Sequence, residues 1–234
     1  MEKSLEMAAF YVKGGCDAIE WSFPPEDPYM DPEYIAEKML AAREGCGDYN
    51  VYLDKLAEFK AAYPVEIYPL LYQETILDIT PARLLDFCLK NGIGTIISAD
   101  LSNERAKSVL MEGGLRLASA VSYAMMPREL ETALSCNGFV YMQAMPTRED
   151  IEAGRGRETL KRCIRKLRGI GVDRPVYCGV GIRDLDDIRF IMDSGGNGLF
   201  LGSAVMRHYD NPEKLMWTVS EYKRTAALLA AEKR

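Results

Sequence analysis

The chain has 234 residues, 48% of them hydrophobic, which is enough to bury one sizeable core. Its formal net charge is -6, so it lacks the overall basic balance that nucleic-acid and lipid surfaces favour. Its single histidine, His208, argues against zinc sites built from several histidines and against a Ser-His-Asp triad, and it is assigned no chemistry. No apolar run approaches the roughly 20 residues that span a bilayer, and no N-terminal signal segment is visible. We therefore expect a cytoplasmic protein with no nucleic-acid partner, no membrane partner and no metal.

Helices and strands are predicted to alternate along the whole chain. The first helix, 5–12, is ended by Gly14-Gly15, and the last begins at Asn211-Pro212. The helices expected between them are 32–43, 54–62, 81–90, 103–111, 128–134, 158–167 and 184–193. The seven expected strands are 17–21, 65–72, 95–100, 115–121, 139–143, 176–178 and a run that starts at Gly198. Pro69 is an awkward residue for a central strand.

This alternation predicts a parallel sheet with helices outside it. No linker or low-complexity segment divides the chain, so a single domain, 1–234, is expected. The fold class is α/β, a TIM (β/α)8-type barrel with seven recognisable strands: either the barrel is incomplete and lacks its first strand, or one strand is not recognisable from the sequence. The basic run 162–168 has apolar residues between its charges and should form the solvated face of a helix. Six cysteines without CxxC spacing favour reduced thiols.

Glycine-bearing turns follow the last two expected strands. Gly179 and Gly181 end one strand, and Gly202-Ser203 ends the apolar run that starts at Gly198. Glycine lets the backbone approach a ligand, and free N–H groups at a helix start favour an anion. Each turn alone is better read as a tight turn. The pair, late in the chain, favours a phosphate site, which barrels place after strands seven and eight.

Glu20 is expected at the end of an apolar strand, where barrel side chains face the ligand. Half-burial would favour its neutral form, which suits a general acid or base. A salt-bridged barrel residue is an equally good interpretation. Asp31 lies eleven residues on, past a proline-rich loop that restricts its position. It either pairs with Glu20 over the same mouth or caps the helix that Pro32 opens, and the cap is favoured for Asp31 alone.

Three further residues are expected at strand ends. Tyr72 and Tyr141 could each line a pocket with an apolar ring and one hydroxyl, although a core role is favoured for each one singly. Asp100 is either a site residue or an acceptor for backbone donors in the next loop, and the second reading is slightly favoured.

Several segments together resemble the tryptophan synthase alpha chain family. The clearest is Gly15-Cys-Asp-Ala-Ile-Glu20-Trp-Ser-Phe-Pro24, followed by Asp27-Pro28 and Asp31. The two glycine turns are similar to the family's phosphate turns, and Leu70-Leu71-Tyr72 and Ser98-Ala99-Asp100 to the ends of its third and fourth strands. The resemblance runs from about Ser4 to the C-terminal helix, with no counterpart of the family's first strand.

The resemblance implies a lyase of tryptophan biosynthesis that cleaves indole-3-glycerol phosphate to indole and glyceraldehyde 3-phosphate without a cofactor. Glu20 would protonate indole carbon 3 and shuttle protons in the retro-aldol step, and Asp31 would hold the indole N–H. Gly181, Gly202 and Ser203 would bind the phosphate through backbone N–H groups. The other expected substrate-binding residues are Tyr72, Asp100, Tyr141 and Gly179.

The chain departs from the family pattern in its loops. The family's loop after its sixth strand reads like Ser-Arg-Ser-Gly-Val-Thr-Gly and folds over the substrate, whereas 144–150 here reads Ala-Met-Pro-Thr-Arg-Glu-Asp. Val180 stands where the family usually has phenylalanine. The stretch after Asp31, which faces the beta subunit in the family, also differs. The implied partners are a small phosphorylated substrate and a tryptophan synthase beta chain.

Two other functions remain open on the sequence. A non-catalytic binder of phosphate ligands, or an assembly partner, is favoured by the changed 144–150 loop and the missing strand. A sugar-phosphate isomerase or aldolase would need a catalytic lysine or a second acid at a strand end, and no lysine ends an expected strand. An open seven-stranded sheet would leave an exposed edge. We expect the N-terminal residues or another subunit, as in a homo-oligomer, to cover it.

Overall fold

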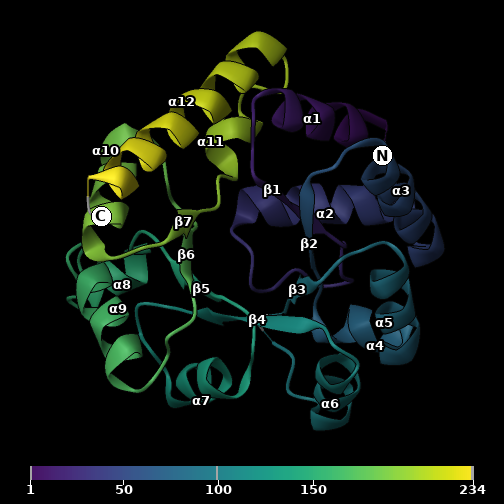
Figure 1. Cartoon of the computed structure of the whole chain (residues 1–234), viewed down its shortest axis with the longest axis horizontal. Coiled ribbons are helices and arrows are strands. Elements are labelled where there is room, and N and C mark those ends of the chain that lie inside the picture. The colour runs from purple at the N-terminus through teal and green to yellow at the C-terminus, as the bar shows by residue number, and fades with distance from the viewer. Residues whose placement is uncertain (1, 99, 233–234) are drawn as a thin grey trace. The chain divides into compact units, whose positions relative to one another are not determined.

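The computed structural model describes residues 2–98 and 100–232 and shows parallel strands alternating with helices (Figure 1). The described residues contain seven strands, which follow one another in sheet order as they do along the chain, β1 to β7. The seven-strand prediction is thus confirmed. The chain forms two compact units, the first running to Leu117 and the second from Ala118 onward, with Lys13–Cys16 belonging to the second.

In the first unit, three parallel strands pair in the order β1-β2-β3. Its elements are α1 (Glu2–Lys13), β1 (Ala18–Ser22), α2 (Glu33–Gly45), α3 (Tyr49–Ala62), β2 (Glu66–Leu70), α4 (Gln73–Ile79), α5 (Pro81–Lys90), β3 (Thr95–Ile97) and α6 (Glu104–Glu112). β4 (Arg116–Val121) begins in this unit and ends in the second. Pro69 is buried inside β2, where a proline removes only one ladder donor.

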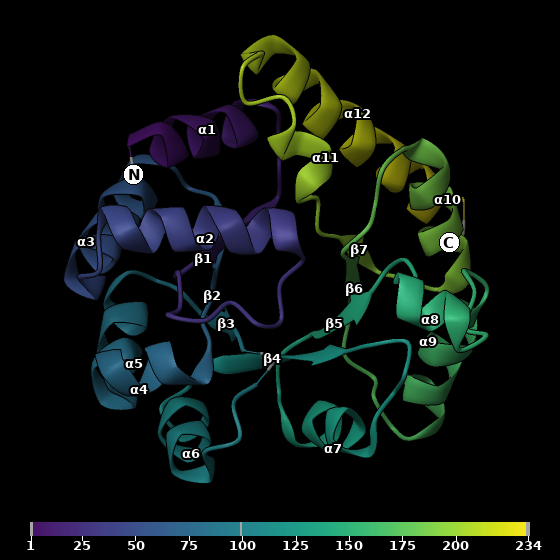
Figure 2. The ribbon, with the colours of Figure 1, turned by 180° about the vertical axis from the view of Figure 1, so that it is seen from behind.

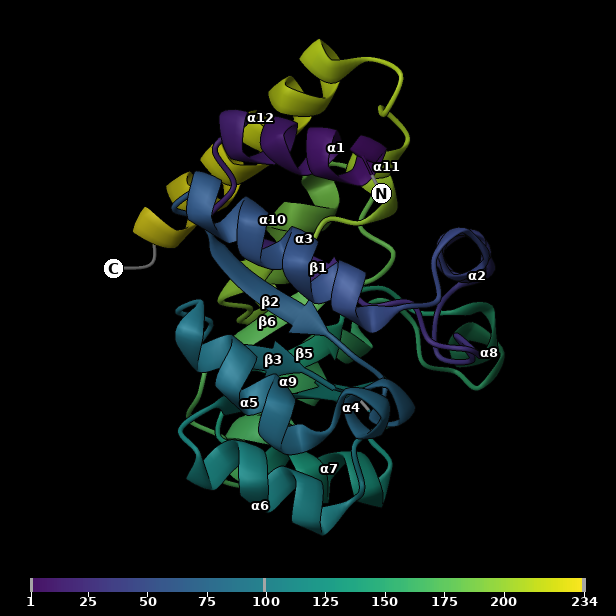
Figure 3. The same ribbon diagram turned by 90° about the vertical axis from the view of Figure 1, so that its right-hand side faces the viewer.

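Helix α3 covers one face of β1. The Trp21 ring lies 5.4 Å from the Phe59 ring of α3, centroid to centroid. Side chains alternate between the two faces along a strand, so the neighbouring residues of β1 face away from α3. Helix α2 is placed differently: Figure 3 shows it apart from α3, on the side toward which β2 points. Only Met39 of α2 is buried, so this helix adds little to the core.

In the second unit, β4 pairs with β5, β5 with β6, and β6 with β7, all in parallel. The elements after β4 are α7 (Pro127–Ser135), β5 (Val140–Gln143), α8 (Arg148–Glu152), α9 (Thr159–Gly169), β6 (Val176–Gly179), α10 (Leu185–Ser194), β7 (Gly198–Leu199), α11 (Ser203–Met206) and α12 (Pro212–Ala231). Helix α10 packs against α9 and α12, and Figure 2 shows this helix layer beside β6.

One face of the second unit's strands forms a dry core with these helices. Val140, Met142 and Cys178 are fully buried there, with Leu160 and Leu167 of α9. The basic run 162–168 lies in α9, whose buried residues are on the other face, as predicted. No helix in the described part of the chain is long and apolar enough to cross a membrane.

Some predicted elements have different limits. Strand 65–72 ends at Leu70, strand 95–100 ends at Ile97, and the last strand has only two residues. Two short helices, α4 and α8, were not predicted, whereas α11 confirms the helical segment expected after Gly202-Ser203. The two missed helices have seven residues or fewer, too short for an apolar period to be visible. The signal that could have revealed α8 is Thr147 followed three residues later by Asp150, a capping box.

Candidate active site

Glu20 lies on the face of β1 that points away from α3, because its neighbour Trp21 packs against that helix. It is the third of five residues in β1 and so lies farther from the strand end than predicted, because Trp21 and Ser22 continue the pairing with β2. Its Oε2 atom is buried, while the residue as a whole is half-buried. Tyr68 is its register partner on β2. Tyr68 was not predicted, although its even spacing from Leu70 and Tyr72 was a usable signal.

Asp31 is held by Tyr72, not by a helix start. The Tyr72 hydroxyl donates to Asp31 Oδ2 at 2.6 Å, and the Met30 N–H donates to the Tyr72 oxygen at 3.3 Å. The capping interpretation was wrong: Pro32 is the N-cap residue of α2, and no side chain caps that helix. Tyr72 lies two residues past β2, is buried, and joins two predicted site residues in one contact.

Burial and this hydrogen bond have opposite effects on the Asp31 carboxyl. Burial raises the pKa of Asp31, and the hydrogen bond from Tyr72 lowers it by a smaller amount. Burial, followed by the adjacent carboxylate, also raises the pKa of Tyr72, so its hydroxyl keeps its proton and stays a donor. The pair thus places a carboxyl in a partly dehydrated environment with one fixed donor.

Asp100 accepts hydrogen bonds from protein groups on both carboxyl oxygens. Its Oδ1 accepts from the Gln73 N–H at 2.9 Å and from Ser98 Oγ at 3.2 Å, and its Oδ2 accepts from the Tyr29 hydroxyl at 3.1 Å. It lies three residues past β3, so the strand-end prediction was wrong. The backbone-acceptor interpretation is confirmed, with the correction that the donor is at the start of α4. Tyr29, 71 residues away, carried no sequence signal for this contact.

In the second unit, Tyr141 and Gly179 fit together. Tyr141 is the second residue of β5, not its end, and its ring stacks on Phe200 with centroids 4.7 Å apart. A Cβ atom at Gly179 would come within 2.6 Å of Tyr141 Cζ and closer still to the hydroxyl oxygen. The absence of a side chain at position 179 therefore makes room for the tyrosine ring.

The turn after Gly179 has a left-handed backbone at two successive residues. Val180 has φ +70° and Gly181 has φ +83°. A Cβ at Gly181 would lie 2.7 Å from Cβ of Met145, so glycine is required there for both conformation and space. Val180 is exposed in a conformation that β-branched residues rarely adopt. Burial raises the pKa of the nearby Cys178 thiol to about 12, so that thiol is not a nucleophile near neutral pH.

Gly202 and Ser203 form the start of α11 and are both exposed. Gly202 has φ -94°, and a Cβ there would meet nothing within 4 Å. The backbone at this corner is therefore open to approach by another molecule. Helix α11 has four residues, so the predicted helix-dipole contribution comes from a single turn. His208 follows this turn, and its backbone N–H donates to the Val205 carbonyl.

The 144–150 segment is ordered around the buried carboxylate of Asp150. Asp150 Oδ2 accepts from Gln143 Nε2 at 2.7 Å and from both the N–H and the hydroxyl of Thr147, and Oδ1 pairs with Arg155 Nε at 2.8 Å. We call Gln143, Thr147, Asp150 and Arg155 the Asp150 clamp. Burial alone would raise the pKa of Asp150, but the hydrogen bonds outweigh it and hold the pKa below its usual value.

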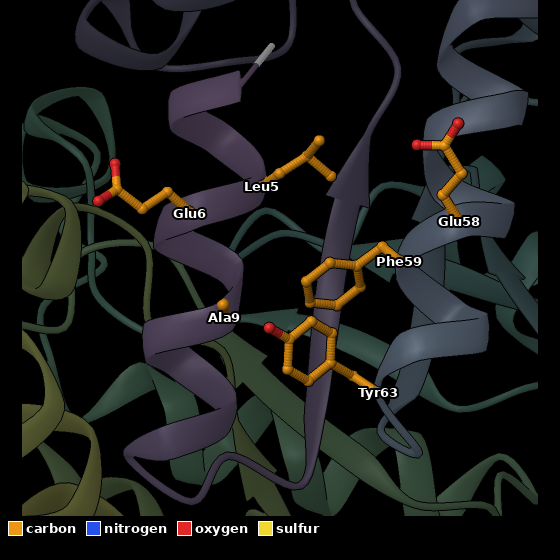
Figure 4. Close-up of a pocket in the computed structure, with 6 residues that line it drawn as sticks. All are labelled: Leu5, Glu6, Ala9, Glu58, Phe59 and Tyr63. Carbon is orange, nitrogen blue, oxygen red and sulfur yellow. The ribbon is translucent and has the colours of Figure 1, made fainter.

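A groove of about 330 Å³ lies on the helix layer of the first unit, between α1 and α3 (Figure 4). Leu5, Ala9, Phe59 and Tyr63 line it with two glutamates, and the two aromatic rings are 4.6 Å apart. The groove contains none of the residues predicted for the site. Among the described residues, no group of three or more histidine, cysteine, aspartate or glutamate side chains could hold a metal ion. All six cysteines are free thiols.

The fit between Tyr141 and Gly179 predicts the effect of one methyl group. Gly179→Ala should lower the free energy of unfolding by about 1–3 kcal/mol, the usual cost of overpacking, because the ring of Tyr141 must move. Gly169→Ala is the matched control, since a Cβ there meets nothing within 4 Å and its φ is not positive. Urea unfolding measures both, and equal midpoints for the two variants would contradict the fit.

Comparison with known proteins gives the family that the sequence resembles. The family model described as tryptophan synthase alpha chain matches residues 1–232. The chain is similar to the tryptophan synthase alpha chain of Aeromonas hydrophila, with 25% identity over 94% of this chain and 85% of that one. It is also similar to that of Prochlorococcus marinus, with 26% identity over 89% of this chain and 79% of that one.

Solved structures share the fold. Tryptophan synthase from M. tuberculosis, in an open form with BRD0059 bound, has a TM-score of 0.81 with 21% identity, covering 96% of this chain and 87% of that chain. The tryptophan synthase complex from Pyrococcus furiosus has a TM-score of 0.75 with 19% identity, covering 98% and 92%. The predicted α/β fold of the TIM-barrel type, with seven strands among the described residues, is confirmed.

Proposed function

The chain belongs to the tryptophan synthase alpha chain family of lyases in tryptophan biosynthesis, and from this we propose that it cleaves indole-3-glycerol phosphate by a retro-aldol step without a cofactor. The products are indole and glyceraldehyde 3-phosphate. The observation that carries the proposal is the pair of carboxyls that the family pattern requires. Glu20 has a buried oxygen on β1, and Asp31 is fixed by the Tyr72 hydroxyl.

Glu20 is the proton carrier in this proposal. It gives its proton to carbon 3 of the indole ring. This protonation activates the bond from that carbon to the glycerol chain for cleavage. Removal of the proton from the adjacent glycerol hydroxyl forms the aldehyde as that bond breaks, and the electron pair returns to the ring. The hydroxyl proton restores the acid, so the cycle has no net proton change. A carboxyl that is partly shielded from water suits both the acid and the base step.

Asp31 holds the ring during this transfer. Positive charge develops on the indole nitrogen when carbon 3 is protonated, and a carboxylate at its N–H stabilises that charge. The Tyr72 hydrogen bond supports the charged form of Asp31 against the effect of burial. Tyr72 is the proposed aromatic contact of the substrate in the first unit, and Tyr141 is the one in the second. Asp100 acts through Tyr29 and the start of α4, since both its oxygens already accept protein donors.

The glycine corners of the second unit hold the phosphate in this proposal. Gly181, Gly202 and Ser203 offer backbone N–H groups at exposed turns, and the exposed corner at Gly202 has open space beside it. Because Gly179 has no side chain, the Tyr141 ring can lie next to the turn that contains Gly181. A phosphate held away from the reacting bond fixes the orientation of the substrate.

An assay of indole release from indole-3-glycerol phosphate tests the proposal. We expect indole and glyceraldehyde 3-phosphate in equal amounts, at a rate proportional to the concentration of the chain. No indole above the rate given by heat-denatured chain would overturn it. Glycerol phosphate raising the melting temperature without turnover would then identify a binder of phosphate ligands.

We further propose a tryptophan synthase beta chain as the protein partner. The solved structures that share the fold include the tryptophan synthase complex from Pyrococcus furiosus. Met30 and Leu40, in the loop before α2 and on α2, expose 45% and 42% of their surface, which leaves apolar area for a partner. Size-exclusion chromatography with light scattering tests this. We expect a mixture with a beta chain to elute as a larger species, and elution of the two chains at their separate masses would contradict it.

A further inference from the structure

The loop between β1 and α2 is attached to the rest of the first unit through Tyr29. The Tyr29 ring meets the Tyr72 ring edge to face, with centroids 5.5 Å apart and planes at 73°. Its hydroxyl reaches past that ring and donates to Asp100 Oδ2 at 3.1 Å. One side chain therefore contacts both the hydrogen-bond partner of Asp31 and the acid that follows β3. We call Tyr29, Tyr72 and Asp100 the Tyr29 latch.

The anchor of this latch is itself rigid. Asp100 Oδ1 is bound by the Gln73 N–H at the first residue of α4 and by the buried Ser98. A second tether, from the Glu26 N–H to Glu74 Oε1 at 2.7 Å, also joins the loop to α4. The loop that carries Asp31 is thus fixed to the residues that follow β2 and β3.

Asp31 itself has little other support from its own segment. It does not cap α2, and its N–H donates to Pro28 within the same loop. Its carboxyl position depends on Tyr72, and the Tyr72 ring is covered by the Tyr29 ring. A displacement of Tyr29 would therefore reach the Asp31 carboxyl through one intermediate side chain.

We propose that Tyr29 is a positioning residue for the reaction, holding Asp31 in place for the indole ring through the Tyr29 latch. This inference rests on the proposed lyase function. Tyr29 does not touch the reacting atoms; it acts by limiting the movement of Asp31. Loss of its hydroxyl should lower kcat and leave KM nearly unchanged, because a carboxylate needed for developing charge acts on the transition state more than on substrate binding.

The test compares Tyr29→Phe with Tyr34→Phe. Tyr34 is a matched control, since it is an exposed tyrosine near the start of α2 whose ring lies under Lys38 Nζ, 4.7 Å from the centroid. We expect Tyr29→Phe to lower kcat about tenfold, in line with the cost of a small misplacement of a reacting group, with Tyr34→Phe unchanged. Tyr29→Leu removes the ring as well and should lower kcat further.

Hydrogen exchange of the unliganded chain is measured on the same variants. The Met30 N–H, which donates to Tyr72, should exchange faster in Tyr29→Phe than in wild type or Tyr34→Phe. Faster exchange with a lower kcat and an unchanged KM supports the proposal. Equal exchange in all three proteins, faster exchange with an unchanged kcat, or a rise in KM alone overturns it. If the wild type releases no indole, the lyase function fails and with it the catalytic part of this inference, while the exchange comparison still decides whether the latch exists.

Discussion

Replacing Glu20 by glutamine is expected to lower kcat for indole release by roughly a thousandfold, within the range that a general acid or base contributes. Glutamine keeps the size of the side chain but can neither give nor take a proton at this site. The Glu20 carboxyl has a buried oxygen on the face of β1 away from α3, so a water molecule does not readily take over its proton transfer. Steady-state kinetics with indole-3-glycerol phosphate measure the effect, and KM should change little.

Glu66→Gln is the control for this substitution. Glu66 is also half-buried and lies on β2, at the opposite end from Leu70 and the Asp31–Tyr72 pair. It should retain full activity, and both variants should melt near the wild-type temperature. If Glu20→Gln and Glu66→Gln had the same kcat as wild type, Glu20 would have no catalytic role and the salt-bridge interpretation would replace it.

Replacing Asp150 by alanine is expected to lower the free energy of unfolding by about 3 kcal/mol, because removal of one member of a buried ion pair leaves its partner uncompensated. Asp150 is 5% exposed, and four hydrogen bonds or ion contacts of the Asp150 clamp end on its two oxygens. Arg155 retains a third of its side-chain exposure, which places the expected loss at the lower end of the range for buried pairs. Urea unfolding at pH 7 measures the difference.

The effect of Asp150 should depend on pH with a defined sign. The fold lowers the pKa of Asp150, so the contribution of this carboxylate is present above its unfolded value, about 3.9, and is lost as the pH falls through the folded value. Wild type and Asp150→Ala should therefore converge in stability in acid. The control is Glu149→Gln, at an exposed neighbour on α8. Its free energy of unfolding should match that of wild type both at pH 7 and in acid. An equal loss in the two variants would show that the clamp adds nothing specific.

The alternation of elements was predictable because each strand has a local apolar signal. The glycines after α1, α5 and α6 mark helix ends that the structure confirms. Strand ends were less accurate, since Tyr72 and Ser98 are as buried as the strands they follow, although Tyr72 is the N-cap residue of α4 and Ser98 donates to Asp100 in the next loop. The single-domain and cytoplasmic expectations stay predictions.

The candidate site was predictable only where its residue types follow a family pattern. Glu20, Asp31, Tyr72 and Asp100 were named from sequence, and the structure joins the last three in one network. The capping interpretation of Asp31 failed because an aspartate directly before a proline is a common local pattern for a helix start. Here the carboxyl instead accepts a hydrogen bond from Tyr72, 41 residues away. Contacts between Tyr29 and Asp100, 71 residues apart, follow from the pairing of strands and have no local signature.

The Asp150 clamp also bears on the thermodynamics of ligand capture. A loop that becomes ordered only when it meets its ligand loses conformational freedom at that moment, which weakens affinity and adds a heat-capacity change. The 144–150 segment is held by protein groups alone, through Gln143, Thr147 and Arg155. In this chain that entropy is lost during folding, so association involves little further ordering of the segment.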